Sequence, residues 1–255
     1  MTTARAACAA FPAGLYQPPG SFRFAVDALL LAAFAAEAAA NTPSPVVLDL
    51  GCGCGVAGLG VLLLRPESRA TGVDVQENLL QAAQANALGL GFTARFSVLH
   101  LDLVQHSEHQ RIPQAAFTIV AMNPPFRNSA AGRLPASASR RTALFATPET
   151  LPAFLAAARH AMTHEGQLAL VYPAEQLEAL CLGLAAENLR PTVIRPVRAR
   201  EASAPIRVLV KARHASSVAD ASYPQPETPL TLFRGTGNSH TPEALAFCPF
   251  LTPSF

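Results

Sequence analysis

The chain has 255 residues, of which 50% are hydrophobic and 14% charged, so its composition is that of a globular protein and excludes a disordered one. The formal net charge of +2 is too small to indicate nucleic-acid binding by itself. The N-terminus has no charged head followed by an apolar run and a cleavage site, so no secretory signal is expected. The alanine-rich run 25–40 contains Asp27 and Glu37 and is too short to span a membrane.

The five cysteines show neither disulfide nor zinc spacing, and two of them, Cys52 and Cys54, lie between glycines. This usage fits a reducing compartment, so a cytoplasmic location is expected. The seven histidines are scattered, and none pairs with Cys or Asp at the spacing of metal ligands, so no metal site is expected.

The chain begins with residues 1–20, which are rich in Ala, Pro and Gly and are expected to be only partly ordered. The alternation in 21–26 predicts a short strand. Asp27 is the predicted N-cap of a helix over 28–39, which Pro43 and Pro45 end.

From residue 46 onward, short apolar runs alternate with helical patterns. The predicted strands are 46–50, 70–73, 94–99, 117–122, 167–172, 193–197 and 206–211, the last two forming a hairpin. The predicted helices are 56–64, 78–88, 151–163 and 174–188. A last strand near 230–233 and a helix at 241–247 follow a Ser/Ala/Pro linker, 214–227. This alternation predicts an α/β fold: a doubly wound, mostly parallel, seven-stranded sheet with an antiparallel C-terminal hairpin.

A glycine-rich loop follows the first of these strands. Gly53-Cys54-Gly55-Val56-Ala57-Gly58 matches G-x-G-x-x-G between a strand and a helix, and Asp74 at the end of the next strand can bind ribose hydroxyls. Both a nicotinamide dinucleotide and S-adenosylmethionine fit this pattern. Asp49, just before the loop, suits the cationic amino group of S-adenosylmethionine better than a pyrophosphate, and Asp102 is placed to accept a hydrogen bond from an adenine amino group.

The stretch Asn123-Pro124-Pro125-Phe126 follows the fourth predicted strand. Two prolines cannot continue a central strand, and the residue before a proline is held extended. Asn123 is therefore expected at the tip of the strand, with Phe126 just beyond, at the carboxyl edge where open α/β sheets bind ligands.

These motifs together resemble the class I S-adenosylmethionine-dependent methyltransferases that modify amino groups. The segment Gln17 to Ala32 further resembles the N-terminal segment of the bacterial tRNA(Val) adenine-37 N6-methyltransferases, and the likeness extends from about Gln17 to Phe250. The resemblance implies a Rossmann-like methyltransferase domain at 46–213, preceded by an N-terminal segment and helix at 1–45. A linker and extension at 214–255 would pack on the same domain.

The resemblance also implies the roles of individual residues. The expected cofactor is S-adenosyl-L-methionine, and the residues expected to bind it are Asp27, Asp49, Gly51, Gly53, Gly55, Asp74 and Asp102. The Asn123 side-chain oxygen and the Pro124 carbonyl would accept both N–H bonds of the target amine, Pro125 would stiffen the turn, and Phe126 would stack on the base.

Basic residues indicate where RNA, expected to be tRNA, would lie. Residues 127–148 form a long polar segment with Arg127, Arg133, Arg140 and Arg141, and the hairpin carries Arg198 and Arg200. The stretch 190–213 contains seven basic residues against one acid, Glu201. Single arginines also occur on ordinary solvated faces. We expect the protein to be a monomer.

Two other functions remain open from the residues alone. One is methylation of another amino group, either guanine N2 in ribosomal RNA or a protein glutamine, because Asn-Pro-Pro followed by an aromatic serves these enzymes too. The glutamine enzymes are expected to carry a helical recognition domain, whereas about 45 residues precede the first strand here. The other is a nicotinamide-dependent oxidoreductase or a non-catalytic nucleotide-binding protein, which leaves Asn123-Pro124-Pro125-Phe126 unexplained.

Overall fold

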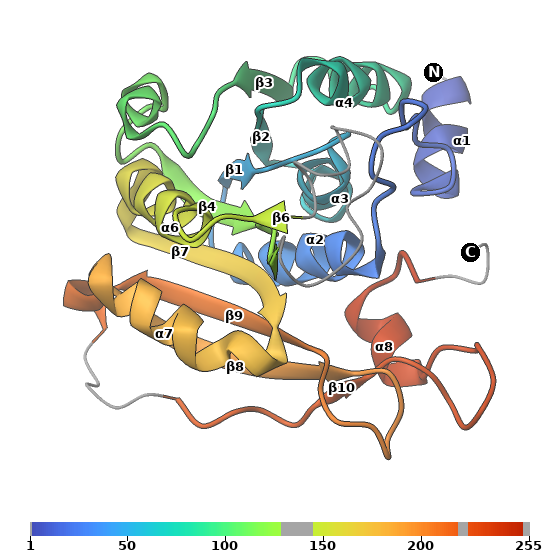
Figure 1. Cartoon of the computed structure of the whole chain (residues 1–255). Coiled ribbons are helices and arrows are strands. Elements are labelled where there is room, and N and C mark those ends of the chain that lie inside the picture. Colours follow the sequence, from blue (N-terminus) through green and yellow to red (C-terminus); the bar gives the residue numbers. More distant parts are fainter. Residues whose placement is uncertain (1, 129–144, 219–223, 252–255) are drawn as a thin grey trace.

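The computed structural model describes residues 2–128, 145–218 and 224–251. A central eight-stranded sheet has the order β10-β8-β9-β7-β4-β1-β2-β3 (Figure 1). Its strands are β1 (Val46–Leu50), β2 (Arg69–Asp74), β3 (Phe96–His100), β4 (Phe117–Met122), β7 (Met162–Pro173), β8 (Leu189–Arg198), β9 (Arg207–His214) and β10 (Leu230–Thr231).

Only β9 runs antiparallel to its neighbours, β7 and β8, whereas the remaining pairs are parallel. The predicted doubly wound α/β fold with an antiparallel C-terminal hairpin is therefore confirmed. The sheet has eight strands instead of seven, because the last predicted strand, near 230–233, also joins it as the two-residue strand β10, which pairs with β8 at the edge of the sheet.

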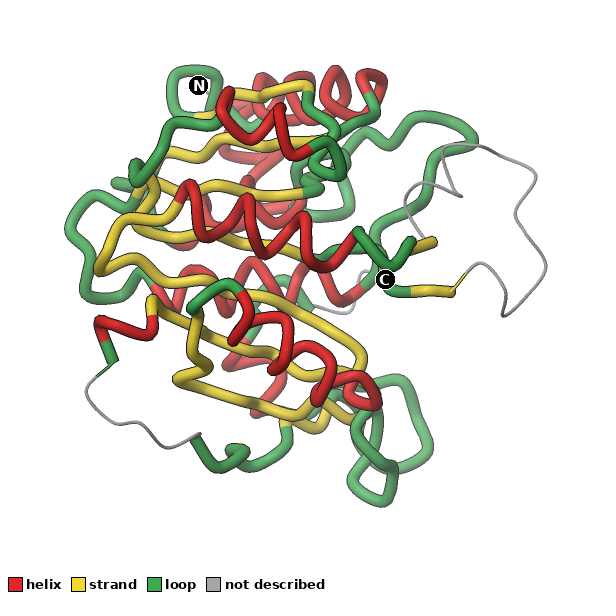
Figure 2. The backbone as a smooth tube through the Cα atoms, turned by 60° about the vertical axis from the view of Figure 1, so that its left-hand side comes forward, coloured by secondary structure: helices red, strands yellow, loops and turns green. Residues whose placement is uncertain are grey.

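Helices cover both faces of the sheet (Figures 1 and 2). They are α1 (Thr2–Ala10), α2 (Val26–Ala38), α3 (Val56–Leu64), α4 (Glu77–Gly89), α6 (Thr150–Ala161), α7 (Leu177–Ala186) and α8 (Pro242–Phe247). The first of two buried clusters contains residues of α2, α3 and α4, and the second contains residues of α6 and α7. Among the described helices, none is both long enough and apolar enough to cross a bilayer.

The central strands are buried on both sides, which explains why they read as continuous apolar runs. In β1, Val47 belongs to the cluster under α2 and α3, whereas Leu48 and Leu50 belong to the cluster under α6. The same alternation holds in β4, where Ile119 faces the first cluster and Val120 the second. Successive side chains of a strand point to opposite faces, so each strand contributes to both cores.

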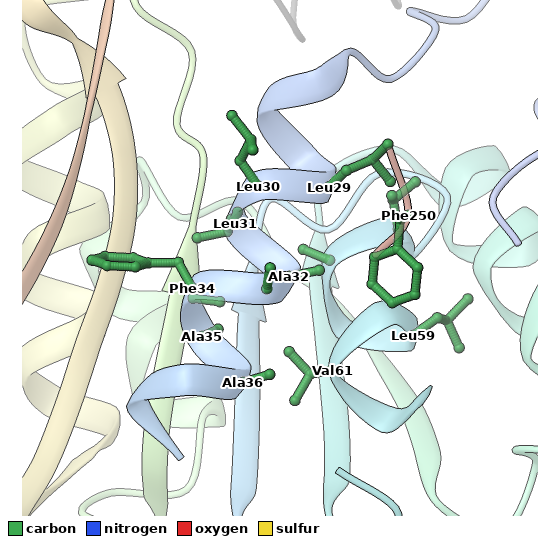
Figure 3. Packing of buried hydrophobic residues seen from close by; sticks show 14 of the residues in the cluster. Leu29, Leu30, Leu31, Ala32, Phe34, Ala35, Ala36, Leu59, Val61 and Phe250 are labelled. Carbon is green, nitrogen blue, oxygen red and sulfur yellow. The ribbon is translucent and has the colours of Figure 1, made fainter. Parts of the chain in front are cut away.

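Helix α2 lies at the centre of the first cluster (Figure 3). Leu30 and Phe34 are fully buried, and the helix packs closely on α3. The closest approach is at Gly60 of α3, where an added Cβ atom would lie 2.7 Å from the Cβ atom of Ala32. A glycine at this position therefore lets the two helix backbones approach each other.

The N-terminal segment differs from its predictions. No strand forms over 21–26, and α2 begins at Val26 with Ala25 as N-cap and no side-chain capping bond, so the predicted N-cap role of Asp27 is wrong. Asp27 instead pairs with a distant arginine, as described below. Residues 1–20 contain the helix α1, which their composition did not predict.

Two further regions depart from the expected boundaries. Strand β7 begins at Met162, five residues before the predicted start, and the predicted helix over 174–188 divides into a 3-10 turn, Ala174–Gln176, and α7. Within the segment 127–148, the backbones of β5 (Arg127–Asn128) and β6 (Phe145–Ala146) form a short parallel pair. The predicted last helix is confirmed as α8, where the Thr241 hydroxyl accepts a hydrogen bond from the Ala244 amide at 3.0 Å.

The contact at Gly60 leads to a stability prediction. Gly60→Ala is expected to lower the free energy of unfolding by about 1–3 kcal/mol, because the added methyl overpacks the α2–α3 contact. Gly89→Ala, at the end of α4, meets nothing within 4 Å and is the control. It is expected to leave stability unchanged or to raise it by about 0.4–1 kcal/mol. Urea unfolding measures both, and equal stability of the two variants would show that the contact is loose.

Candidate active site

A cavity of ≈ 450 Å³ opens at the carboxyl edge of the sheet, where β1, β2, β3 and β4 end. It lies at the point where the strand order reverses, because β1 has β4 on one side and β2 on the other. Ligands of open α/β sheets bind at this position. Ten of the predicted site residues line the cavity: Asp27, Asp49, Gly51, Gly53, Asp74, Asp102, Asn123, Pro124, Pro125 and Phe126. Gly55 lies in the same loop but does not line it.

The glycine loop has a left-handed backbone at Gly51, Gly53 and Gly55, with φ of 73°, 56° and 90°. L-residues with side chains rarely adopt this conformation, which explains the alternating glycines. The loop is held to the end of β2, since the amides of Gly51 and Cys52 both donate to the Val73 carbonyl, at 2.8 and 2.9 Å. A Cβ atom added at Gly53 would meet nothing within 4 Å, so that part of the loop faces open space.

Two buried carboxylates flank the loop. Asp49 is 2% exposed and accepts a hydrogen bond from the Gly58 amide at 2.8 Å. Burial raises the pKa of Asp49 to about 7, although that bond opposes the shift and the nearby Asp74 adds to it. Burial also raises the pKa of Asp74, against hydrogen bonds from backbone amides that include those of Gln76 and Gly53, both at 2.9 Å. The cavity therefore presents carboxyl groups whose negative charge a cationic ligand would stabilise.

The third acid, Asp102, lies beyond the end of β3. Its carboxylate accepts hydrogen bonds from the Val104 amide and from the Gln105 side chain, both at 3.1 Å, so it also shapes its own turn. Leu101 and Leu103, on either side of Asp102, line the cavity as well. The wall here is thus apolar beside one carboxylate, an arrangement suited to a flat ring with a polar edge.

Asn123-Pro124-Pro125-Phe126 follows β4 directly, as predicted. Pro124 is buried, whereas Asn123 and Phe126 are half-buried. Within the described parts of the chain, no residue hydrogen-bonds the Asn123 side chain or the Pro124 carbonyl. Phe126 packs partly on the core and meets the Tyr172 ring edge-on, with 6.4 Å between ring centroids. Its ring is thus both a core contact and part of the cavity wall.

An arginine that was not among the predicted site residues also lines this cavity. Arg207, the first residue of β9, lines the cavity, and its Nε donates to the Asp27 carboxylate at 2.9 Å. Its guanidinium carbon lies 4.7 Å from the centre of the Phe126 ring, over the ring face. Asp27 thus stands on the cavity wall as the partner of Arg207, and its binding of a cofactor stays a prediction.

The N-terminal segment is joined to the glycine loop by Asn86 of α4, which was not among the predicted site residues either. The Asn86 side chain accepts from the Tyr16 amide at 2.7 Å and donates to the carbonyls of Tyr16 and Cys54, at 3.0 and 2.9 Å. The residues near Asn86 in the sequence do not indicate that its side chain would bond to Tyr16 and Cys54. This bridge fixes the segment that precedes α2 against the loop beneath the cavity.

The predicted RNA-binding arginines fall into two groups. Arg133, Arg140 and Arg141 lie outside the described residues, and of Arg127 only the backbone is described. Arg198 donates to the Thr231 hydroxyl at 2.8 Å, and Arg200 donates to the carbonyls of Gly235 and Gly237, at 2.5 and 2.8 Å. Both therefore hold the C-terminal extension, and they remain half-buried beside the turn that precedes Arg207.

The other basic residues of the hairpin are largely paired with acids from elsewhere in the chain. Glu37 of α2 receives Lys211 at 2.6 Å and Arg195 at 3.4 Å, and Arg195 also pairs with Glu227 at 2.5 Å. Arg213 pairs with Glu165. The basic stretch 190–213 is therefore less available to RNA than its composition suggests. No group of three or more metal-ligating side chains is found within the described ranges.

Comparison with known proteins places the chain in one family. The family described as "Methyltransferase small domain" matches residues 26–184, more than half of the chain. A "tRNA1(Val) (adenine(37)-N6)-methyltransferase" of Porphyromonas gingivalis is 28% identical over 238 residues, which cover 92% of this chain and 91% of that protein.

Of two other matches, one covers a shorter segment and the other has a lower sequence identity. A "release factor glutamine methyltransferase" of Rhodopirellula baltica is 30% identical over 86 residues, 34% of this chain and 28% of that protein. The crystal structure of a "predicted O-methyltransferase" from Agrobacterium tumefaciens has a TM-score of 0.67 at 19% identity and covers 88% of this chain and 96% of that one. At that identity, the structural likeness shows the fold alone.

The raised pKa of Asp49 predicts a pH-dependent difference in stability. In the folded protein Asp49 stays protonated until pH approaches about 7, whereas in the unfolded chain it ionises near 3.8. Its contribution to stability is therefore full below about pH 4 and is lost as pH rises through about 7. Asp49→Asn keeps an acceptor for the Gly58 amide and cannot ionise.

Urea unfolding at pH 5 and pH 8 tests this difference without any ligand. Relative to the variant, the parent is expected to lose about 3 kcal/mol of unfolding free energy between the two pH values. A difference between the two proteins that does not change with pH would contradict a neutral, buried Asp49.

Proposed function

Because the chain belongs to the methyltransferase small domain family, we propose that this S-adenosylmethionine-dependent enzyme methylates the N6 amine of an adenine in tRNA, at the position of adenine 37. One observation carries the proposal. The Asn123 amide, to which no described residue hydrogen-bonds, and the Phe126 ring stand in the same cavity as the glycine loop and its carboxylates. The name of the Porphyromonas gingivalis relative, which matches nearly the whole chain, supports the choice of substrate.

The cavity has the chemistry that this cofactor needs. S-adenosylmethionine carries a methyl group on a cationic sulfonium, a cationic amino group, ribose hydroxyls and an adenine ring. Asp49 and Asp74 are carboxyl groups whose ionised form a cationic ligand would stabilise, the left-handed glycine loop offers close backbone approach, and Leu101 and Leu103 offer an apolar wall. A nicotinamide dinucleotide would instead bring a pyrophosphate toward these carboxylates, so the charge of the cavity favours the methyl donor.

Asn123 and Pro124 supply the second half of the site. The exocyclic amine of adenine is a weak nucleophile, because its lone pair is delocalised into the ring. The Asn123 side-chain oxygen and the Pro124 carbonyl can each accept one N–H bond of that amine, which aims the lone pair at the methyl carbon. The displacement is in line, so the contribution of these residues is orientation and polarisation.

The target base reaches such a cavity only outside its stack. Phe126 is partly exposed in the cavity and provides an aromatic surface for the extruded base. Arg198 ends β8 and Arg200 lies in the hairpin turn that precedes Arg207, the residue of β9 that lines the cavity. We therefore assign the RNA backbone to this turn, together with the arginines of 127–141.

A second candidate is methylation of a protein glutamine, whose side-chain amide also presents an amine beside a carbonyl. The partial match to a release factor glutamine methyltransferase favours it. That match covers only a third of this chain, whereas the tRNA enzyme matches across 92%. A guanine N2 amine would suit the same pair of acceptors. Identification of the methylated product distinguishes adenine, guanine and glutamine as the substrate group.

The cofactor assignment predicts a binding difference. Asp74→Ala is expected to lower the affinity for S-adenosylhomocysteine by about tenfold to a hundredfold, since a charge-assisted hydrogen bond is worth about 1.5–3 kcal/mol. Glu77→Ala removes an exposed carboxylate that does not line the cavity, and it is expected to bind as the parent does. Calorimetry with S-adenosylhomocysteine and NAD measures these affinities. Tighter binding of NAD by the parent would overturn the assignment.

The role of Asn123 predicts a loss of rate without a loss of binding. Asn123→Ala is expected to lower methyl transfer to unmodified tRNA by about 10²–10³-fold, with unchanged affinity for S-adenosylhomocysteine. Asn78→Ala changes an exposed asparagine of α4 in the same way and serves as the control. Labelled methyl groups give the rate and mass analysis gives the modified nucleoside. If Asn123→Ala reacts at the parental rate, Asn123 is only a turn residue.

A further inference from the structure

The position of Arg207 follows from the topology of the sheet. Strand β9 is antiparallel to β7, and Arg207 pairs with Pro173, the last residue of β7. The antiparallel strand therefore begins at the edge where the parallel strands end. Its first side chain reaches the same cavity as Asp49 and Asn123.

Three segments far apart in sequence meet at this arginine. Its Nε donates to the Asp27 carboxylate at 2.9 Å, and its Nη1 donates to the Ile206 carbonyl at 2.9 Å. Its guanidinium lies over the face of Phe126, 4.7 Å from the ring centre. The side chains of Arg207 and Asp27 are 23% and 12% exposed, so the pair is largely shielded from water. Cation–π contacts are stronger where the cation is partly desolvated.

Asp27 is well placed to hold the guanidinium. It lies in the first turn of α2, where the helix dipole favours a carboxylate. The helix itself is fixed in the core by Leu30 and Phe34. The carboxylate is therefore a rigid anchor, and the arginine that it binds has little freedom to leave the ring.

We propose that Arg207 is a positioning residue, which covers one face of Phe126 so that the target base stacks only on the other. The inference rests on the proposed function and extends it. Asp27 fixes the guanidinium, the guanidinium fixes the ring, and the ring sets the plane of the base whose amine meets Asn123. Methyl transfer in line with the sulfonium depends steeply on this orientation, because a displacement of about 1 Å can cost about a hundredfold in rate.

Arg195 of β8 provides a matched control. Its side chain is 22% exposed, pairs with Glu37 and Glu227, and lies over the Phe247 ring with 5.2 Å to the ring centre. It therefore loses the same kinds of contact as Arg207 when it is replaced. It does not line the cavity.

The test is a double-mutant cycle with Phe126. Arg207→Met is expected to lower kcat for methylation of tRNA by about tenfold to a hundredfold, with unchanged KM for S-adenosylmethionine. In a Phe126→Leu background the same change is expected to have no further effect, because Arg207 acts through the ring. Arg207→Lys is expected to restore part of the rate. Arg195→Met is expected to leave kcat unchanged in both backgrounds.

Equal losses from Arg207→Met with and without the Phe126 ring would overturn the proposal, since Arg207 would then act independently of it. A second measurement does not depend on the substrate. In the parent with ring-labelled phenylalanine, the NMR signal of Phe126, assigned by its absence from Phe126→Leu, is expected to shift with Arg207→Met and not with Arg195→Met. If the parent methylates no tRNA, the proposed function is wrong. The change in the NMR signal of Phe126 still shows whether Arg207 fixes the Phe126 ring.

Discussion

The site depends on one constraint, which is that β1 and β4 lie side by side at the point where the strand order reverses. Leu50 and Met122 are paired residues at the ends of these strands, and each strand is stopped at once, one by the glycine loop and the other by two prolines. The α3 and α6 helices then pack on opposite faces of the sheet, so that a cavity opens between the two strand ends. The residues proposed to bind the cofactor and the amine are thus neighbours because of topology, although more than 70 residues separate Asp49 from Asn123.

The sequence predicted those parts of the fold and the site that have a local pattern. Parallel strands are marked by apolar runs, the loop by alternating glycines that adopt positive φ, and the strand tip by Asn123-Pro124. The contact of Arg207 with Asp27 and Phe126 has no such pattern, since it joins residues 180 and 81 positions apart. The predicted hairpin nevertheless contained a usable signal, because an antiparallel strand that follows a parallel one must begin at the carboxyl edge. Asp27 is a residue type that favours the N-cap, but α2 begins at Val26, two residues before the predicted start, which leaves the Asp27 carboxylate for the arginine.

Charge is the property that the linear sequence described least well. The stretch 190–213 carries a strong excess of basic residues along the chain, yet Arg195, Arg207, Lys211 and Arg213 pair through space with acids from α2, β7 and the segment at Glu227. Pairs of this kind hold the hairpin against α2 and reduce its net field. Arg198 and Arg200, at the hairpin turn, instead donate to the Thr231 hydroxyl and to the carbonyls of Gly235 and Gly237.

The central claim is that one cavity orients an exocyclic amine between the cofactor loop and Asn123. It is tested most directly by a crystal structure of the protein with S-adenosylhomocysteine and an RNA stem-loop that carries adenine in its loop. The account predicts an adenine outside its stack, with its N6 within hydrogen-bonding distance of the Asn123 side-chain oxygen and the Pro124 carbonyl, and its ring on the Phe126 face opposite Arg207. An adenine bound elsewhere, or one whose N6 points away from Asn123, would contradict it.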